Sequence, residues 1–241
     1  GQEGAGIVSN DNGHLIGHRG TGLLTQVFSD EREIKRLKGD RAIGHVRYAT
    51  AGSGGTDNIQ PFIFRFHDGD MALCHNGNLT NCLSLRRKLE DEGAIFHSNS
   101  DTEVLMHLIR RSTQRTFMDK LKEALNIVHG GFAYLIMTEN AMIGALDPNG
   151  FRPLSLGKMK NGAYVLASET CALDVVGAEL VRNIRPGEIV VVDDHGYKIV
   201  QYTNQTQLAI CSMEFIYFAR PDSDIYGVNV HSARKRMGAR L

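Results

Sequence analysis

The chain has 241 residues, 42% of them hydrophobic, which is enough to bury the core of one large domain or of two small ones. Its 27 basic residues balance its 27 acidic residues, so the composition gives no bulk attraction to nucleic acid or to an anionic membrane, and a small molecule is the expected partner. No apolar run reaches the ~18 residues of a membrane span, and the N-terminus lacks the charged and apolar regions of a signal peptide, so a cytoplasmic protein is expected.

The four cysteines, Cys74, Cys82, Cys171 and Cys211, are widely separated and include no C-x-x-C pair. This spacing argues against a zinc site and against a disulfide framework, so the thiols are expected to be reduced. Because the chain starts at Gly1 without an initiator methionine and leads at once into an apolar segment, we expect it to be a fragment.

The first part of the chain predicts strands. Two apolar runs joined by turn-forming residues, 5–8 and 14–17, have the pattern of a hairpin, and Gly20-Thr21-Gly22 predicts a turn because the rest of a phosphate-binding motif is missing. Residues 42–50 alternate as a strand, which places Ile43, His45, Arg47 and Ala49 on one face and Val46 and Tyr48 on the other.

The segment from Leu73 to Leu79 combines an apolar strand with the sequence His-Asn-Gly-Asn. Asn-Gly is a frequent tight-turn signal, so a plain structural turn is one interpretation. The other is a pair of hydrogen-bond donors, the Asn76 side-chain amide and the Gly77 backbone N–H, which is what an oxyanion requires in acyl transfer.

Three helices are predicted in mid-chain. The first follows the turn at Asn76, the second begins at Ser100-Asp101-Thr102-Glu103 with the S-x-x-E pattern of a capping box, and the third runs from Thr116 to Gly130-Gly131. Helical spacing points these residues toward the core: Leu79, Cys82, Leu83 and Leu89; Val104, Leu105, Leu108 and Ile109; Phe117, Leu121, Leu125 and Val128.

From Phe132 onward the pattern is that of consecutive antiparallel strands, at 132–138, 141–146, 154–157, 163–168, 188–193 and 197–202. Strands, then helices, then strands, without βαβ alternation, predict an α+β fold whose sheets are covered by helices. Residues 230–241 are basic and predict one further helix. Cys74 and His75 are adjacent, but neighbouring strand residues point to opposite faces, so Cys74 is expected to be a small buried residue rather than half of a catalytic pair.

Several motifs are distributed over the whole chain: residues 1–7 (GQEGAGI), 44–52 (GHVRYATAG), 75–79 (HNGNL), 100–103 (SDTE) and 147–154 (DPNGFRPL). Together they resemble the class II glutamine amidotransferases. Residues 214–223 (EFIYFARPDS) and 231–234 (HSAR) resemble one family among them, the amidophosphoribosyltransferases, where they lead into a phosphoribosyltransferase domain.

The resemblance implies a four-layer αββα sandwich of the N-terminal-nucleophile hydrolase type. It implies a glutamine amidotransferase type 2 domain at 1–210, and at 211–241 a linker and the start of a phosphoribosyltransferase domain. In this family an N-terminal cysteine attacks the glutamine amide, with its own α-amine as base, and releases ammonia. The ammonia then converts phosphoribosyl pyrophosphate to 5-phosphoribosylamine in purine biosynthesis. The alternatives are another class II amidotransferase, such as one making amino sugar phosphates, or a glutamine-binding module that is inactive for want of this cysteine.

The resemblance also assigns residues. Asn76 and Gly77 would form the oxyanion hole, Arg47 would bind the α-carboxylate of glutamine with help from Thr50, and Asp101 would bind the α-ammonium group. Asp101 also has a simpler interpretation, because a carboxylate in the first turn of a helix is stabilising in itself.

The implied cofactors are Mg²⁺ in the phosphoribosyltransferase domain and, in one branch of the family, a 4Fe–4S cluster held by four cysteines. Cys211 lies where the first of those cysteines would be, but a lone cysteine is also a common packing residue, so both interpretations stay open. The implied partners are glutamine, phosphoribosyl pyrophosphate and further copies of the chain in a tetramer, with neither nucleic acid nor membrane.

Overall fold

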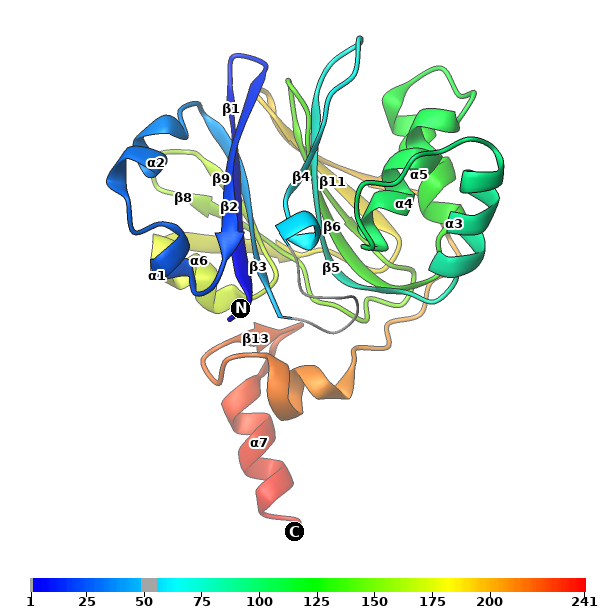
Figure 1. The fold of residues 1–241 in the computed structure, drawn as a ribbon. Coiled ribbons are helices and arrows are strands. Elements are labelled where there is room, and N and C mark those ends of the chain that lie inside the picture. The colour runs from blue at the N-terminus through cyan, green and yellow to red at the C-terminus, as the bar shows by residue number, and fades with distance from the viewer. Residues whose placement is uncertain (1, 49–55) are drawn as a thin grey trace. The chain divides into compact units, whose positions relative to one another are not determined.

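A computed structural model describes residues 2–48 and 56–241 (Figure 1). The chain divides into two compact units. The first unit comprises Gly1–Gly130 and Tyr134–Ile143, and the second comprises Gly131–Ala133 and Gly144–Leu241. The boundary passes through two strands, β6 (Gly130–Met137) and β7 (Met142–Leu146), so each unit contains part of both.

One sheet of the first unit has the antiparallel order β2-β1-β3, formed by β1 (Gly4–Asp11), β2 (His14–Thr21) and β3 (Arg41–Arg47). The predicted hairpin is confirmed, but the turn predicted at Gly20-Thr21-Gly22 is wrong for its first two residues, because pairing with β1 carries β2 through Thr21. The alternation predicted for β3 is confirmed up to residue 48: Ile43 and Arg47 are buried, whereas Val46 and Tyr48 are exposed. Ala49 lies outside the described residues.

The other strands of the first unit are β4 (Phe62–Phe64), β5 (Met71–Leu79) and its parts of β6 and β7, in the order β7-β6-β5-β4. Apolar side chains of both sheets form one core, and Cys74 belongs to it, as predicted. Burial raises the pKa of the Cys74 thiol to about 12. The core residues are Val8, Leu15, Ile43, Ala72, Cys74 and Met137.

Helices α3 (Cys82–Asp91), α4 (Thr102–Arg111) and α5 (Phe117–Ile127) lie beside β5 and β6 (Figure 1). The Thr116 hydroxyl accepts the Asp119 N–H at 3.1 Å and caps α5 where its start was predicted. The inward orientation predicted for Leu83 is wrong: its side chain is 73% exposed, because α3 turns Leu89 toward the core.

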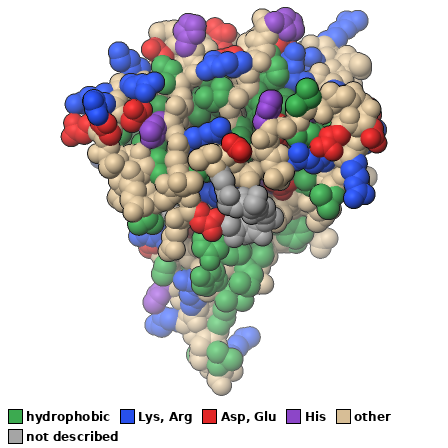
Figure 2. All heavy atoms as spheres, viewed as in Figure 1, with side chains coloured by type: hydrophobic (Ala, Val, Ile, Leu, Met, Phe, Trp, Pro, Cys, Tyr) green, Lys and Arg blue, Asp and Glu red, His purple; other side chains and the backbone are tan. Residues whose placement is uncertain are grey.

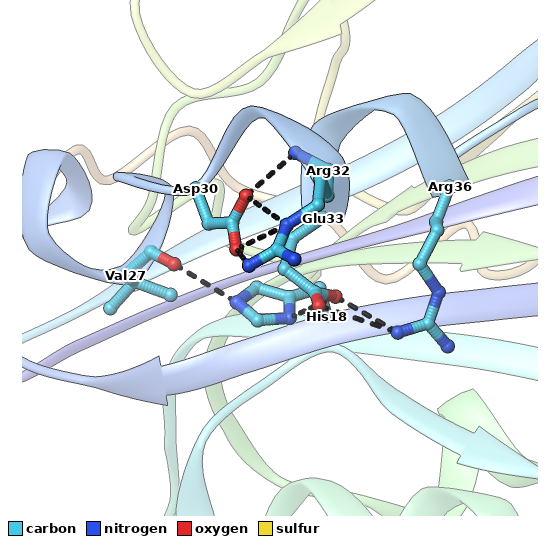
Figure 3. Close-up of polar contacts among 6 residues, drawn as sticks. All are labelled: His18, Val27, Asp30, Arg32, Glu33 and Arg36. Atoms are coloured by element: carbon cyan, nitrogen blue, oxygen red, sulfur yellow. Dashed lines mark hydrogen bonds and ion pairs between the residues drawn. The ribbon is translucent and has the colours of Figure 1, made fainter.

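Two short helices that periodicity did not predict, α1 (Leu24–Val27) and α2 (Glu31–Arg36), lie beside β1 and β2. Figure 3 shows how they are attached to β2: His18 Nε2 is 2.9 Å from the Val27 carbonyl oxygen, and His18 Nδ1 is 3.1 Å from Glu33 Oε2. The first unit therefore has helices outside each of two facing sheets.

The second unit contains a sheet of order β10-β8-β9, formed by β8 (Ser155–Met159), β9 (Tyr164–Ala167) and β10 (Ala178–Asn183) and contacted by α6 (Thr170–Val176). Its remaining strands have the order β12-β11-β7, with β11 (Glu188–Asp193) and β12 (Gly196–Gln201). The predicted strands all exist, but they are not one consecutive series, because β8 and β9 pair with β10 while β11 neighbours β7.

The C-terminal part of the second unit consists of a π-helical turn (Glu214–Phe218), β13 (Asp224–Ile225), β14 (Val228–Asn229) and α7 (Val230–Gly238). The predicted C-terminal helix is confirmed, and the Asn229 side chain caps it by accepting the Ser232 N–H at 3.0 Å. Within the described ranges, no helix combines the length and the apolar character needed to cross a bilayer. Acidic and basic side chains are interspersed on the face shown in Figure 2, in keeping with a net charge of zero.

Candidate functional site: the end of strand β5

The end of β5 carries Asn76 and Gly77, and the turn predicted there is wrong. Both residues belong to the strand, which continues to Leu79, and Gly77 has a φ of 145°, a conformation that favours glycine. Backbone contact with β6 explains the difference, because Thr80 N donates to the His129 carbonyl oxygen at 2.8 Å. At Gly130, with a φ of 137°, a Cβ would overlap the carbonyl oxygen of Asn78.

Strand β3 places Arg47 close to this end of β5. Cys74 Sγ lies 3.9 Å from the Gly44 carbonyl oxygen, and one residue further along both strands His45 lies against the backbone of His75. Arg47 is the last residue of β3, two positions beyond His45. Burial and, to a smaller extent, the adjacent His75 lower the pKa of His45 to about 4, so His45 is neutral.

Arg47 is a buried cation that is only 9% exposed. Its guanidinium has no hydrogen-bond or ion-pair partner within residues 2–48 and 56–241. A desolvated charge without a counter-charge is costly, and an anionic ligand group would remove that cost.

Asp101 lies directly before the first residue of α4 and is bonded to β5. Its Oδ2 accepts the Leu79 N–H at 2.8 Å, and its Oδ1 lies 3.4 Å from His75 Nδ1. Burial acts to raise the pKa of Asp101, but contact with His75, together with the N–H groups of Leu79 and Thr102, outweighs burial and lowers the pKa. The Asp101 carboxylate is therefore fixed to β5 at His75 and Leu79, the two residues that bracket the candidate oxyanion donors along the strand.

The capping box predicted at the start of α4 is also wrong. The Asp101 side chain makes no cap hydrogen bond, and Glu103 turns away from Ser100 to the preceding loop. There the Glu103 carboxylate accepts the N–H groups of His97 and Ser98, both at 2.9 Å, and the Ser98 hydroxyl at 2.7 Å. Glu103 thus fixes the loop that delivers Asp101 to β5.

We expect Glu103→Gln to destabilise the fold in a pH-dependent way. Burial acts to raise the pKa of Glu103, but the nearby His107, 3.8 Å away, and the hydrogen bonds from His97 and Ser98 lower it from 4.5 to about 2. A lowered pKa gives stability that is complete above about pH 4.5 and disappears as the pH falls through about 2; the shift corresponds to about 3 kcal/mol.

Urea unfolding of parent and variant at pH 7, 5, 4 and 3 measures this effect. The difference in unfolding free energy should be largest at pH 7 and shrink below pH 4.5. Glu90→Gln, which alters an exposed ion pair with Arg86 at 2.9 Å, is the matched control and should cost less than about 1 kcal/mol. A difference for Glu103→Gln that did not change with pH would contradict the assigned pKa.

The remaining predicted site residues are not brought to this place. Thr50 lies outside the described residues. Cys211 lies in the second unit at the start of the π-helical turn, where its N–H is 3.3 Å from the Phe151 carbonyl oxygen. A 4Fe–4S cluster requires four ligands, and the part of the chain that the structure describes has no group of three or more metal-binding side chains, so Cys211 has no set of cluster ligands around it there.

Sequence reasoning missed three buried polar residues around Asp101, namely His75, Gln60 and Thr102. His75 N donates to Gln60 Oε1 at 2.6 Å, and Gln60 Nε2 donates to Thr102 Oγ1 at 3.1 Å. For His75 a signal existed, because strand alternation places it on the face opposite to Cys74 and Asn76. For Gln60 there was none, because its contacts are 15 and 42 residues away along the chain.

Comparison with known proteins identifies the class of protein that has this fold and site. Residues 45–175, more than half of the chain, match the glutamine amidotransferase domain family. The chain belongs to this family.

Among curated proteins, the chain is 58% identical over its whole length to amidophosphoribosyltransferase of Staphylococcus aureus strain Mu50, of which it covers 49%. It matches a solved structure of "the allosteric regulatory enzyme of purine biosynthesis" with a TM-score of 0.95 and 54% identity, over 99% of this chain and 51% of that one. It also matches a solved structure of glutamine phosphoribosylpyrophosphate amidotransferase from Bacillus subtilis, complexed with ADP and GMP, with a TM-score of 0.93 and 54% identity. This match covers 99% of this chain and 51% of that one. The chain thus spans about half the length of these relatives, and the predicted αββα sandwich of the N-terminal-nucleophile type is confirmed.

Proposed function

We propose that this chain is the glutaminase half of an enzyme that transfers the amide nitrogen of glutamine to phosphoribosyl pyrophosphate, in the first step of purine biosynthesis. The products are 5-phosphoribosylamine, glutamate and pyrophosphate. The observation that carries the proposal is the set of groups at the ends of β3 and β5: a buried cation without a partner among the described residues, a fixed carboxylate and two candidate oxyanion donors. Relatives named amidophosphoribosyltransferase favour this acceptor over amino sugar phosphates.

A free amino acid is recognised most simply by one fixed cation and one fixed anion. Arg47 binds the α-carboxylate of glutamine through its planar guanidinium, aided by Thr50, and Asp101 binds the α-ammonium group. These two anchors place the side-chain amide of glutamine beside Asn76 and Gly77. The amide NH₂ of Asn76 and the backbone N–H of Gly77 then stabilise the negative charge that develops on the amide oxygen.

The nucleophile in this proposal is a cysteine at the mature N-terminus, with its α-amine as base. The thiol sulfur attacks the amide carbon, and the α-amine takes the thiol proton and passes it to the departing nitrogen. Ammonia is released, a glutamyl thioester remains on the cysteine, and water then hydrolyses it to glutamate. The four cysteines of this chain do not suit that role, because none has a free α-amine. Burial also raises the pKa of Cys74, Cys82 and Cys171, which opposes thiolate formation.

Ammonia release from glutamine tests the proposal. We expect no turnover by the chain from Gly1 to Leu241, and turnover by a version extended at its N-terminus to begin with the nucleophilic cysteine. The matched control begins with serine at the same position and should be at least about 10²-fold slower, because an alcohol is a much weaker nucleophile than a thiol. Equal ammonia release by all three proteins would overturn the assigned nucleophile.

The remaining parts of the proposal concern the whole protein. Residues 1–210 form the glutamine amidotransferase type 2 domain, and residues 211–241 form a linker and the start of the phosphoribosyltransferase domain. That second domain binds phosphoribosyl pyrophosphate with Mg²⁺, and the protein acts in the cytoplasm as a homo-oligomer, a tetramer by resemblance. No step is assigned to an iron–sulfur cluster, because Cys211 has no further ligands around it in the described part of the chain.

A further inference from the structure

We infer that His75 is a positioning residue that orients the Asp101 carboxylate for the α-ammonium group of glutamine. This inference rests on the proposed function, because it names how one anchor of the same site is held. His75 is buried on β5, with a side chain that is only 1% exposed. Its ring stacks on the fully buried Tyr134 at a centroid distance of 4.4 Å and an interplanar angle of 26°, so the imidazole has one orientation.

The carboxylate of Asp101 is attached to β5 at two points on either side of the oxyanion donors. Oδ1 faces the ring of His75 at 3.4 Å and Oδ2 accepts the Leu79 N–H at 2.8 Å, while Asn76 and Gly77 lie between these two residues on the strand. A carboxylate held by one oxygen can still rotate, whereas one held by both has a fixed plane. The position of the anion is thereby set relative to the oxyanion donors.

The surroundings of His75 determine which ring nitrogen carries the proton. An ionised carboxylate only accepts hydrogen bonds, so contact with Asp101 requires the proton on Nδ1. Nε2 is buried and has no hydrogen-bond partner among the described residues. With the proton on Nδ1, Nε2 is an unpaired acceptor. The opposite tautomer would bury an unpaired N–H at Nε2 and place two acceptors, Nδ1 and the Asp101 carboxylate, against each other.

Gln60 and Thr102 hold the histidine in place. Gln60 Oε1 accepts the backbone N–H of His75 at 2.6 Å, and Gln60 Nε2 donates to Thr102 Oγ1 at 3.1 Å. Thr102 Oγ1 in turn lies 3.4 Å from His75 Nδ1. Because Thr102 is also the first residue of α4, this network connects the start of the helix, Asp101 and β5 into one rigid unit.

The test uses the full-length protein with its N-terminal cysteine, and two substrates: glutamine, and the analogue that lacks the α-amino group, 4-carbamoylbutanoate. The parent should prefer glutamine because only glutamine uses Asp101. His75→Phe keeps the stacking on Tyr134 but removes the hydrogen-bond donor. We therefore expect it to lower kcat/KM for glutamine about 10–100-fold, mainly through KM, while kcat/KM for the analogue stays within about 3-fold of the parental value. His75→Asn places an amide N–H near the position of Nδ1 and should restore most of the preference.

His18→Phe is the matched control, because His18 also packs against an aromatic ring, Phe28 at 5.2 Å, but does not contact Asp101. It should leave the preference for glutamine unchanged. If His75→Phe lowered kcat/KM equally for both substrates, or kept the parental preference, the inference would be overturned. If the parent itself showed no preference for glutamine, the proposed role of Asp101 would fail instead, so the two failures are distinguishable.

Discussion

Asn76→Ala is expected to lower kcat for ammonia release from glutamine about 10²–10³-fold, with little change in KM, in the protein that begins with the nucleophilic cysteine. The amide of Asn76 interacts only weakly with the bound substrate, because the substrate carbonyl oxygen is weakly charged until the thiol attacks. It then becomes one of two donors to a full negative charge in a half-buried site. Interactions of this kind stabilise the transition state more than the bound substrate, so their loss appears in kcat.

Steady-state kinetics with glutamine, and in parallel with free ammonia as the nitrogen source, measure this effect. Synthesis from free ammonia should survive the substitution, because ammonia bypasses amide hydrolysis. Asn126→Ala, the same chemical change on the exposed surface of α5, is the matched control and should leave both activities unchanged. A kcat within a few-fold of the parent for Asn76→Ala would leave Asn76 with only a structural role at the end of β5.

Arg47→Ala is expected to have its effect on binding: KM for glutamine should rise roughly 10²-fold while kcat changes only a few-fold. The reason is that a carboxylate held by a bidentate guanidinium is held equally in the bound substrate and in the transition state. Arg47→Lys should fall between parent and alanine variant, because an ammonium keeps the charge but cannot form the planar pair of hydrogen bonds.

Binding can also be measured without turnover, by the rise in Tm that glutamine produces in the chain itself. The rise should be lost in Arg47→Ala and kept in Arg87→Ala, which removes an exposed arginine from α3. Without glutamine, Arg47→Ala should unfold at or above the Tm of the parent, because it removes a buried cation that has no partner in the described residues. A lower Tm in the absence of glutamine would show that Arg47 is primarily a structural residue.

Much of the fold follows from local patterns in the sequence. The alternation of β3 identified the buried face that carries Arg47, and the Thr116 cap located the start of α5, because both signals depend on a few neighbouring residues. Helices α1 and α2 were missed because four and six residues are too few for a helical period to appear.

The details of the site were less accessible to prediction. The Asn-Gly signal was read as a turn, but pairing of β5 with its neighbours extends the strand through both residues. The S-x-x-E signal predicted a capping box, but the Glu103 carboxylate instead accepts hydrogen bonds from the backbone of His97 and Ser98 in the preceding loop. At Asn76-Gly77 contacts distant in sequence override a local preference, and the hydrogen bond between Asp101 and Leu79, 22 residues apart, is of the same kind. At Glu103 a different local contact, five and six residues back along the chain, replaces the predicted one.

The absence of a side chain at Gly130 bears on how this site tolerates mutation over evolutionary time. The carbonyl oxygen of Asn78 occupies the space that a Cβ would take, and Leu79 Cα and Thr80 N lie 2.9 and 3.1 Å from that position. The end of β5 is therefore shaped by backbone packed on backbone, a constraint that no change of neighbouring side chains can relieve. In a library of random variants, position 130 should accept glycine alone while exposed positions of the adjacent helices drift freely, so the geometry of the site can persist in sequences that share little else.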